Sequence, residues 1–363
     1  MMKQTAKTRA EARLRLLLSG VMLVFFPACT SNEKFYTSSD FNGVEKCDAH
    51  FHYLTYDTSY IVFARSLNFK ILTPVWDGEE VSVKDQISVA SAIKKACPGD
   101  FAFFGTFDAD SVNSPGFSAY ARRSIIDFMD AGASGLKIWK NIGMVIRDST
   151  GKFIMIDDPL FDPLFSFLVR EEIPVIAHLG EPRDCWLPLD EMTDKGNASY
   201  YRNNPQYHMY KHPEVPSYES QINATRNLLL KYPRLKFTGA HLASIEWSVD
   251  ELSRLMDECP NLKVDLAARI SQVQAQSDEN ISKVRDFFIR YQDRIVYGTD
   301  FEVHDIESGS ESMKLNLQKG WQEHWNYLAT DSCRGHRGLK LPSSVIDKIY
   351  YHNTAEYFSG KER

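Results

Sequence analysis

The 363-residue sequence lacks an excess of positive charge, and this excludes one large class of partner. Lysine and arginine total 42, whereas aspartate and glutamate total 48, so the net charge is −6. A nucleic-acid-binding protein normally concentrates basic residues to neutralise phosphates, and this composition offers no such surplus. Hydrophobic residues make up 43% of the chain and charged residues 25%, which is typical of a folded protein. We therefore expect no nucleic acid among its partners.

The sequence also lacks, near its N-terminus, an apolar run long enough to cross a membrane. The run 16–26 has 11 residues, whereas a spanning helix needs about 20. A stretch rich in Lys and Arg precedes it, and Phe26-Pro27-Ala28-Cys29 follows, which resembles the lipobox of bacterial lipoproteins. We interpret residues 1–28 as a signal peptide and Cys29 as a lipid-modified N-terminus. Ordinary cleavage after a small residue is the alternative.

Removal of this segment changes the charge of the chain. The part that starts at Cys29 has 37 basic and 47 acidic residues, a net charge of −10. Acyl chains on one cysteine would anchor it to a membrane of the bacterial cell envelope, with no other membrane contact. We expect residues 29–43 to form a disordered polar tether and residues 44–363 to form one folded domain. The sequence does not predict an oligomeric state.

The other five cysteines lack the spacing of a disulfide framework or a structural zinc site. They are Cys47, Cys97, Cys185, Cys259 and Cys333, an odd number without a CxxC pair. We predict that they are free thiols, mostly buried.

Strand and helix patterns alternate from residue 46 onward, and no internal repeat interrupts them. The eight predicted strands are 46–52, 70–75, 101–107, 134–139, 174–179, 235–241, 262–266 and 295–299. Predicted helices between them include 118–131, 159–171, 218–232 and 249–258. Eight βα units favour a closed (β/α)₈ TIM barrel, with functional residues at the carboxyl ends of the strands. An open doubly wound sheet is the alternative.

One predicted connection, 180–217, is far longer than the few residues usual between a strand and a helix. It is rich in aromatic side chains, and its position after strand 5 suggests a lid over the barrel mouth. The alternative is a surface excursion packed by its own side chains.

Histidines are placed in a pattern that suggests a metal site. In the segment Asp48-Ala49-His50-Phe51-His52, alternation along a strand predicts that Asp48, His50 and His52 share one face. Two imidazoles about 6.6 Å apart on an inward face could bind one divalent ion. His178, His241 and Asp300 each end another predicted strand. Four imidazoles and one carboxylate are therefore expected at the same rim of the barrel.

This arrangement resembles the amidohydrolase superfamily, and its context is most similar to the amidohydrolase-2 family of metal-dependent hydrolases and decarboxylases. The resemblance covers residues 44–358 and includes the closing segment 352–358, where Thr354 separates the Asn from the Ala. It implies a divalent cofactor, with zinc expected, as one or two ions. It implies that the metal ligands are His50, His52, His178 and Asp300, and that His241 ligates a second metal or acts on substrate.

Lys137 matches a position where two-metal members carry a carboxylated lysine that bridges the ions. The sequence leaves other roles open for it, namely a contact to a substrate carboxylate or a charge pairing with a neighbour such as Asp48.

A site of this kind favours hydrolysis of a small polar lactone, ester or amide by a water activated on the metal. Asp300 is the candidate catalytic base, and His241 is expected to donate to the developing oxyanion. Decarboxylation of a small carboxylic acid and a non-catalytic surface binding lipoprotein are the alternatives. Substrate contacts are predicted from Arg183, His208 and Arg269 in the loops, although either arginine could instead form a surface ion pair.

Overall fold

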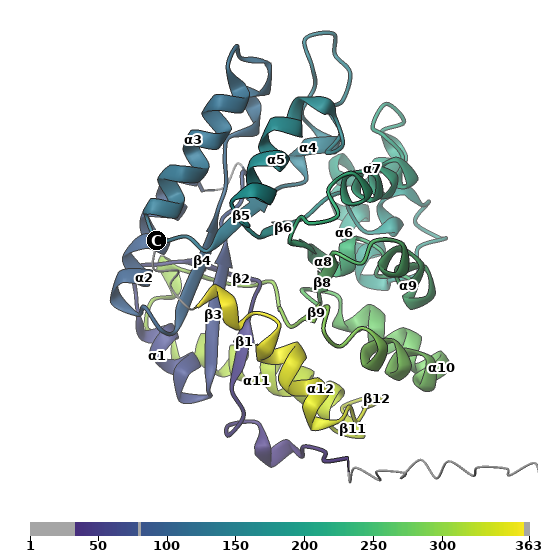
Figure 1. Cartoon of the computed structure of the whole chain (residues 1–363). Coiled ribbons are helices and arrows are strands. Elements are labelled where there is room, and N and C mark those ends of the chain that lie inside the picture. Colours follow the sequence, from purple (N-terminus) through teal and green to yellow (C-terminus); the bar gives the residue numbers. More distant parts are fainter. Residues whose placement is uncertain (1–32, 79–80, 359–363) are drawn as a thin grey trace, which may run out of the picture. The chain divides into compact units, whose positions relative to one another are not determined.

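The computed structural model describes residues 33–78 and 81–358, and an eight-stranded parallel sheet lies at the centre of this part (Figure 1). Its strands, in spatial order, are β1 (Lys46–Asp48), β3 (Phe69–Pro74), β4 (Phe101–Gly105), β5 (Gly135–Ile138), β6 (Val175–Ala177), β7 (Phe237–Gly239), β8 (Leu262–Asp265) and β9 (Ile295–Val296). Each lies within or close to one of the eight predicted strands. Sequential neighbours pair throughout, as repeated right-handed βα units require.

The sheet closes on itself through the first and last strands. Strand β2 (Phe51–Leu54) continues the first strand and pairs in parallel with β10 (Phe301–His304), which continues the last. Between these pairs, the Ala49 amide donates to the Tyr297 carbonyl at 3.0 Å, and the Asp300 amide donates to the His50 carbonyl at 2.7 Å. These bonds remove the two free edges, so the fold is the predicted (β/α)₈ TIM barrel and the open sheet is excluded.

Helices cover the outside of the barrel. They are α1 (Ser59–Ser66), α2 (Val83–Ala96), α3 (Phe117–Asp130), α4 (Asn141–Met144), α5 (Asp162–Arg170), α6 (Lys195–Asn203), α7 (Tyr218–Lys231), α8 (Ala240–Ala243), α9 (Val249–Glu258), α10 (Ile270–Arg290), α11 (Glu311–Ala329) and α12 (Ser343–Asp347). The four predicted helices are confirmed as α3, α5, α7 and α9. Serine N-caps begin two of them, because Ser217 accepts from the Ser220 amide and Ser248 from the Glu251 amide.

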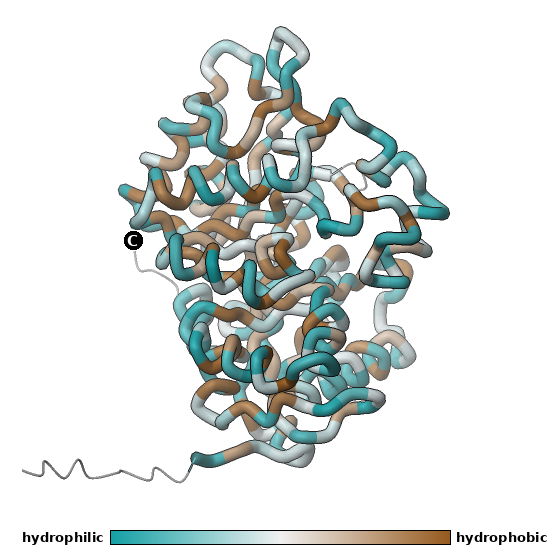
Figure 2. Tube along the Cα trace, turned by 90° about the vertical axis from the view of Figure 1, so that its right-hand side faces the viewer, coloured by the Kyte–Doolittle hydropathy of each residue, from teal (hydrophilic) through white to brown (hydrophobic). Residues whose placement is uncertain are grey.

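Hydrophobic side chains fill two regions. Figure 2 shows hydrophobic and hydrophilic stretches alternating along the helices, which is the pattern of amphipathic helices that pack on one face. One buried cluster lies between sheet and helices, and a smaller cluster includes Cys47, Ala49, Phe104 and Tyr357. In the closing segment, the side-chain amide of Asn353 donates to the carbonyls of Gln292 and Ile295, at 2.8 and 2.7 Å. The segment that carries part of the family resemblance therefore ties the chain end to the last strand.

The structure differs from the predicted tether. Residues from Lys34 onward belong to the same compact unit as the barrel. Phe35 forms a β-bridge with Pro342, the Tyr36 hydroxyl donates to Asp347 at 2.8 Å, and Phe41 is buried. The prediction of disorder is wrong for 34–43 because these aromatic side chains gain more from burial than the backbone loses in entropy.

The predicted signal peptide 1–28 and Cys29 lie outside the described residues. Among the described helices, none is both long enough and apolar enough to cross a membrane. All five cysteines named above are free thiols, and Cys47, Cys185 and Cys259 are buried. Cys97 and Cys333 are partly exposed, so the prediction of mostly buried thiols is confirmed.

Candidate metal centre

The first strand breaks inside the histidine motif, and the break decides which way its side chains point. Strand β1 ends at Asp48 and β2 begins at Phe51. The Asp48 carboxylate accepts from the Thr299 amide at 3.0 Å, from the Thr299 hydroxyl at 2.6 Å and from the Trp321 indole of α11 at 2.8 Å. The prediction that Asp48 shares a face with the two histidines is wrong, because the two residues between β1 and β2 interrupt the alternation.

His50, His241 and Asp300 come together as predicted, although they lie far apart in the sequence. One ligand atom from each lies within 4.8 Å of the other two. The Asp300 Oδ1 atom is 3.4 Å from His50 Nε2 and 3.2 Å from His52 Nε2. Both histidines of the motif therefore face the same carboxylate. This agrees with the prediction that the two imidazoles point inward at the rim of the barrel.

His178 completes the cluster. Its ring centroid is 4.2 Å from that of His241, and the Trp139 ring packs edge-on against it at 5.0 Å. Neither ring nitrogen of His178 has a hydrogen-bond partner in the described part of the chain, although both are buried. Buried nitrogens without partners are costly, so these atoms are the ones that a ligand would satisfy.

Asp265, at the end of β8, orients two of the histidines. Its Oδ2 atom is 2.7 Å from His50 Nδ1, and its Oδ1 atom accepts from the His241 amide at 2.7 Å. His241 Nδ1 in turn lies 2.9 Å from the carbonyl oxygen of Ala267. These bonds place the ring protons on Nδ1 and leave the Nε2 lone pairs for the centre. Our sequence analysis missed Asp265; a carboxylate that ends a hydrophobic strand was the available signal.

The geometry changes the role predicted for His241. Burial lowers the pKa of His241 to about 3, with a further lowering from Arg269 and His50 that Asp300 opposes. The ring is therefore neutral, and its single proton is used on the Ala267 carbonyl. Nε2 can act as a ligand, whereas the donor role predicted for His241 would need a second ring proton and stays a prediction.

Lys137 is fully buried inside the barrel, with Nζ 3.3 Å from His50 Nε2. Burial lowers the pKa of Lys137 to about 8, while Asp265 and Asp300 act in the opposite direction. The prediction that Asp48 neutralises it is wrong, since Asp48 points toward α11. Its ammonium group is instead the positive charge nearest to the ligand cluster, and carboxylation stays a prediction.

Asp300 has the most exposed side chain of the cluster. It adopts a left-handed backbone conformation with φ of 67°, and its side chain is 31% exposed against 0% for His50 and 10% for His52. Burial alone would raise the pKa of Asp300, but its electrostatic interactions with His241 and His50 and its hydrogen bond with His52 hold that pKa well below its usual range. Asp300 is therefore a carboxylate at neutral pH.

These donors fit a divalent ion. Neutral imidazoles with free Nε2 lone pairs and one carboxylate are the ligand set expected for zinc and similar ions. His50, His241 and Asp300 would hold the ion, with His52 and His178 beside them. The unpartnered nitrogens of His178 support this assignment independently of the sequence motif.

The long segment after β6 is packed by its own side chains. Its Asp184 carboxylate accepts from the Thr193 amide and hydroxyl, each at 3.1 Å, and from the Asp194 amide at 2.9 Å. His208 is buried, with Nε2 2.7 Å from the Leu187 carbonyl oxygen. The alternative of a self-packed excursion is therefore confirmed. His208 has a structural role there in place of the predicted substrate contact.

The predicted arginines lie in different surroundings. The Arg183 guanidinium stacks on the Trp247 ring at 4.3 Å. Arg269 forms no ion pair with an acidic group of the described residues. Its buried Nε atom has no hydrogen-bond partner among these residues. Arg269 is therefore the better candidate of the two arginines for binding an anionic substrate group. A nearby carboxylate, Glu181, was not predicted from the sequence; it forms an ion pair with Lys140 and lies 4.0 Å from the Nε2 atom of His178.

Comparison with known proteins agrees with the observed fold and with the family that the sequence resembles. The sequence model of a family described as amidohydrolase matches residues 47–359. A 2,6-dihydroxybenzoate decarboxylase from Rhizobium has a similar structure, with a TM-score of 0.52, 11% identity, and coverage of 87% of this chain and 98% of that one. A protein described as amidohydrolase II has a TM-score of 0.51, 14% identity, and coverage of 87% and 100%. No curated protein sequence matches this chain.

Proposed function

Because the chain belongs to the amidohydrolase family, we propose that it is a metal-dependent hydrolase of a small polar carbonyl compound, a lactone, an ester or an amide. The observation that carries this proposal is the position of Asp300. Its carboxylate lies 3.2 and 3.4 Å from two imidazole nitrogens and is also the exposed member of the cluster. It can therefore contact a water molecule and the metal ligands at the same time.

Each residue of the cluster has a defined part in this reaction. A divalent ion, zinc or a similar ion, would lower the pKa of a water molecule and polarise the carbonyl group. Asp300 accepts the proton of the attacking water and returns it to the leaving group. The Lys137 ammonium donates to the oxygen that gains negative charge, which replaces the donor role first expected of His241. Asp265 keeps His50 oriented while this happens.

Decarboxylation is the second candidate, and one observation is compatible with it. Lys137 is a buried cation beside the ligand cluster, and Arg269 has a buried nitrogen without a partner in the described part of the chain. Two such cations suit a substrate that carries a carboxylate. The same groups would bind the carboxylate of a hydrolysable substrate, so they support an anionic substrate in either reaction.

The function is tested with the purified chain in three steps. Metal analysis of protein from metal-replete medium is expected to find one or two equivalents of a divalent ion, and removal by a chelator is expected to abolish turnover. A panel of lactones, esters and amides is then assayed for hydrolysis, and a hydroxybenzoate panel is assayed for CO₂ release. Metal-free, inactive protein would favour the non-catalytic binding lipoprotein.

Two variants make the test specific. Asp300→Asn is expected to lower kcat by about 10²–10⁴-fold, because the base is removed while the shape is kept. His178→Ala is expected to lose bound metal and turnover with an unchanged circular dichroism spectrum. Asp305→Asn, which changes an exposed carboxylate at the other end of β10, is the matched control and should retain full activity. CO₂ release without hydrolysis would select the decarboxylase.

A further inference from the structure

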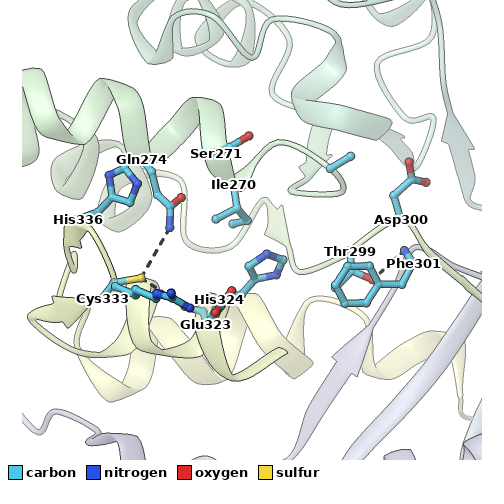
Figure 3. A pocket seen from close by; sticks show the side chains of 12 residues that line it. Ile270, Ser271, Gln274, Thr299, Asp300, Phe301, Glu323, His324, Cys333 and His336 are labelled. Atoms are coloured by element: carbon cyan, nitrogen blue, oxygen red, sulfur yellow. Dashed lines mark hydrogen bonds between the residues drawn. The ribbon is translucent and has the colours of Figure 1, made fainter. Parts of the chain in front are cut away.

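A cavity of about 470 Å³ begins at Asp300 and extends away from the ligand cluster. Figure 3 shows Asp300 at one end of it, and His336 and Cys333 at the other. Its walls come from the start of α10, from α11 and from the hairpin formed by β11 (Ser332–Cys333) and β12 (His336–Arg337). The volume lies within the range typical of small-molecule sites.

Asp300 is the one member of the ligand cluster among the residues that line this cavity. The imidazoles of the cluster are buried, whereas the Asp300 side chain is 31% exposed and lines the cavity. A substrate whose reacting carbonyl lies at Asp300 therefore has room for a further part of its structure. Phe301 lies beside Asp300 and Ile270 lies nearer the middle of the cavity, and both offer apolar contacts to a hydrocarbon chain.

Two side chains of opposite charge are among the residues that line the cavity. Arg334 and Glu323 both line the cavity, and neither forms an ion pair in the described part of the chain. Cys333 lies beside both residues, because it precedes Arg334 in the chain and its thiol lies 3.7 Å from the main-chain carbonyl oxygen of Glu323. His336, by contrast, is already paired with Asp278 at 2.8 Å. Arg334 and Glu323 are thus the charged groups available to a ligand.

We propose that this cavity binds the distal end of the substrate, and that this end is a carboxylate with an amine or a hydroxyl group on the neighbouring carbon. The Arg334 guanidinium binds the carboxylate in a two-point contact, and the Glu323 carboxylate accepts from the amine or hydroxyl group. A bare carboxylate would leave Glu323 unpaired beside a like charge, which makes it a poorer ligand. This inference rests on the proposed function, because it places the reacting carbonyl at Asp300.

The test uses three ligands that cannot react, so that binding is measured separately from catalysis. They are 2-aminohexanoate, 2-hydroxyhexanoate and hexanoate, titrated by calorimetry into the metal-loaded full chain. We expect the amino and hydroxy acids to bind at least about tenfold more tightly than hexanoate, since each adds a hydrogen bond to a charged group. The tighter of the two identifies the natural end group as an amino acid or a hydroxy acid.

Three variants locate the binding. Arg334→Gln is expected to weaken all three ligands by about tenfold or more, and Glu323→Gln is expected to remove only the advantage over hexanoate. Arg337→Gln changes an exposed arginine of the same hairpin that does not line the cavity, and it should leave all affinities unchanged.

Several outcomes would overturn the inference. Equal affinities for the three ligands would do so, as would a loss in Arg337→Gln as large as that in Arg334→Gln. Affinity that does not depend on Arg334 would mean that the carboxylate binds at the metal. Failure of the proposed function gives a different result from failure of this inference. The expected binding pattern without any hydrolysis would contradict the hydrolase proposal and support the subsite. Hydrolysis without that binding pattern would support the hydrolase and contradict the subsite.

Discussion

Asp265 shows how much of the centre depends on a single side chain that does not itself ligate. It holds the Nδ1 proton of His50 and the main-chain amide of His241, both at 2.7 Å. His50 therefore presents its Nε2 lone pair in a fixed direction before any ion binds, and the Ala267 carbonyl does the same for the His241 ring. Partners of this kind contribute to metal affinity by removing the choice of tautomer and ring orientation.

At this scale we predict that Asp265→Asn weakens metal binding by about 10- to 100-fold without unfolding the protein. The amide keeps the size of the carboxylate but presents one acceptor oxygen, instead of two, to three donors, which are His50 Nδ1 and the main-chain amides of His241 and Ala267. Competition with a chromophoric chelator measures the affinity. Asp257→Asn, which changes a surface carboxylate paired with Arg290, is the control and should bind metal normally. Unchanged affinity in Asp265→Asn would show that His50 is oriented by other contacts.

At the scale of elements, the junction between the first and last strands positions the site. Asp48 on β1 accepts three close hydrogen bonds, two of them from Thr299, the residue before Asp300. Asp300 then takes a left-handed conformation and donates its amide to His50. One buried carboxylate thus fixes the two strands that carry both motif histidines and the Asp300 carboxylate. The third donor, the Trp321 indole, ties this junction to α11.

We predict that Asp48→Asn lowers the free energy of unfolding by about 1–3 kcal/mol, because its amide group must face a buried donor. Urea unfolding followed by circular dichroism measures the loss. Trp321→Phe removes only one of the donors to Asp48, so the loss of that hydrogen bond should lower the free energy of unfolding by less than Asp48→Asn does. Its smaller ring also fills less of the core, which lowers the free energy of unfolding further. An unchanged unfolding midpoint in Asp48→Asn would contradict the account of the junction.

For the whole chain, the position of the first packed residues limits how the protein could be held at a membrane. The folded unit starts at Lys34, so only four residues separate it from Cys29. At about 3.5 Å per residue, a lipid on Cys29 would keep the barrel within roughly 20 Å of the bilayer surface. We propose a lipid-anchored enzyme of the bacterial cell envelope.

Cys29→Ala is expected to move the protein from the membrane fraction to the soluble fraction of the cell. The variant should keep its specific activity, since Cys29 is not one of the residues of the candidate metal centre. Immunoblots of fractionated cells measure the shift, and Cys97→Ala is the matched cysteine control. Retention of Cys29→Ala in the membrane fraction would show that another feature holds the protein there.

The sequence by itself determined the class of fold and the kind of centre. Eight strand patterns with helices between them require a parallel sheet, and side chains that end parallel strands must meet at one edge. His50, His52, His178, His241 and Asp300 were therefore predictable as one group. These features depend on local periodicity and on which residue stands at the end of each strand.

Only the tertiary structure decided what each of these side chains can do. The break after β1 turns Asp48 toward α11, and the Asp265 and Ala267 oxygens select the tautomers of His50 and His241. The aromatic residues of 34–43 are ordered by partners on α11 and α12, about 300 positions away along the chain. Such contacts join residues that are distant in sequence, and a hydrogen bond of this kind leaves no periodic signal in the chain.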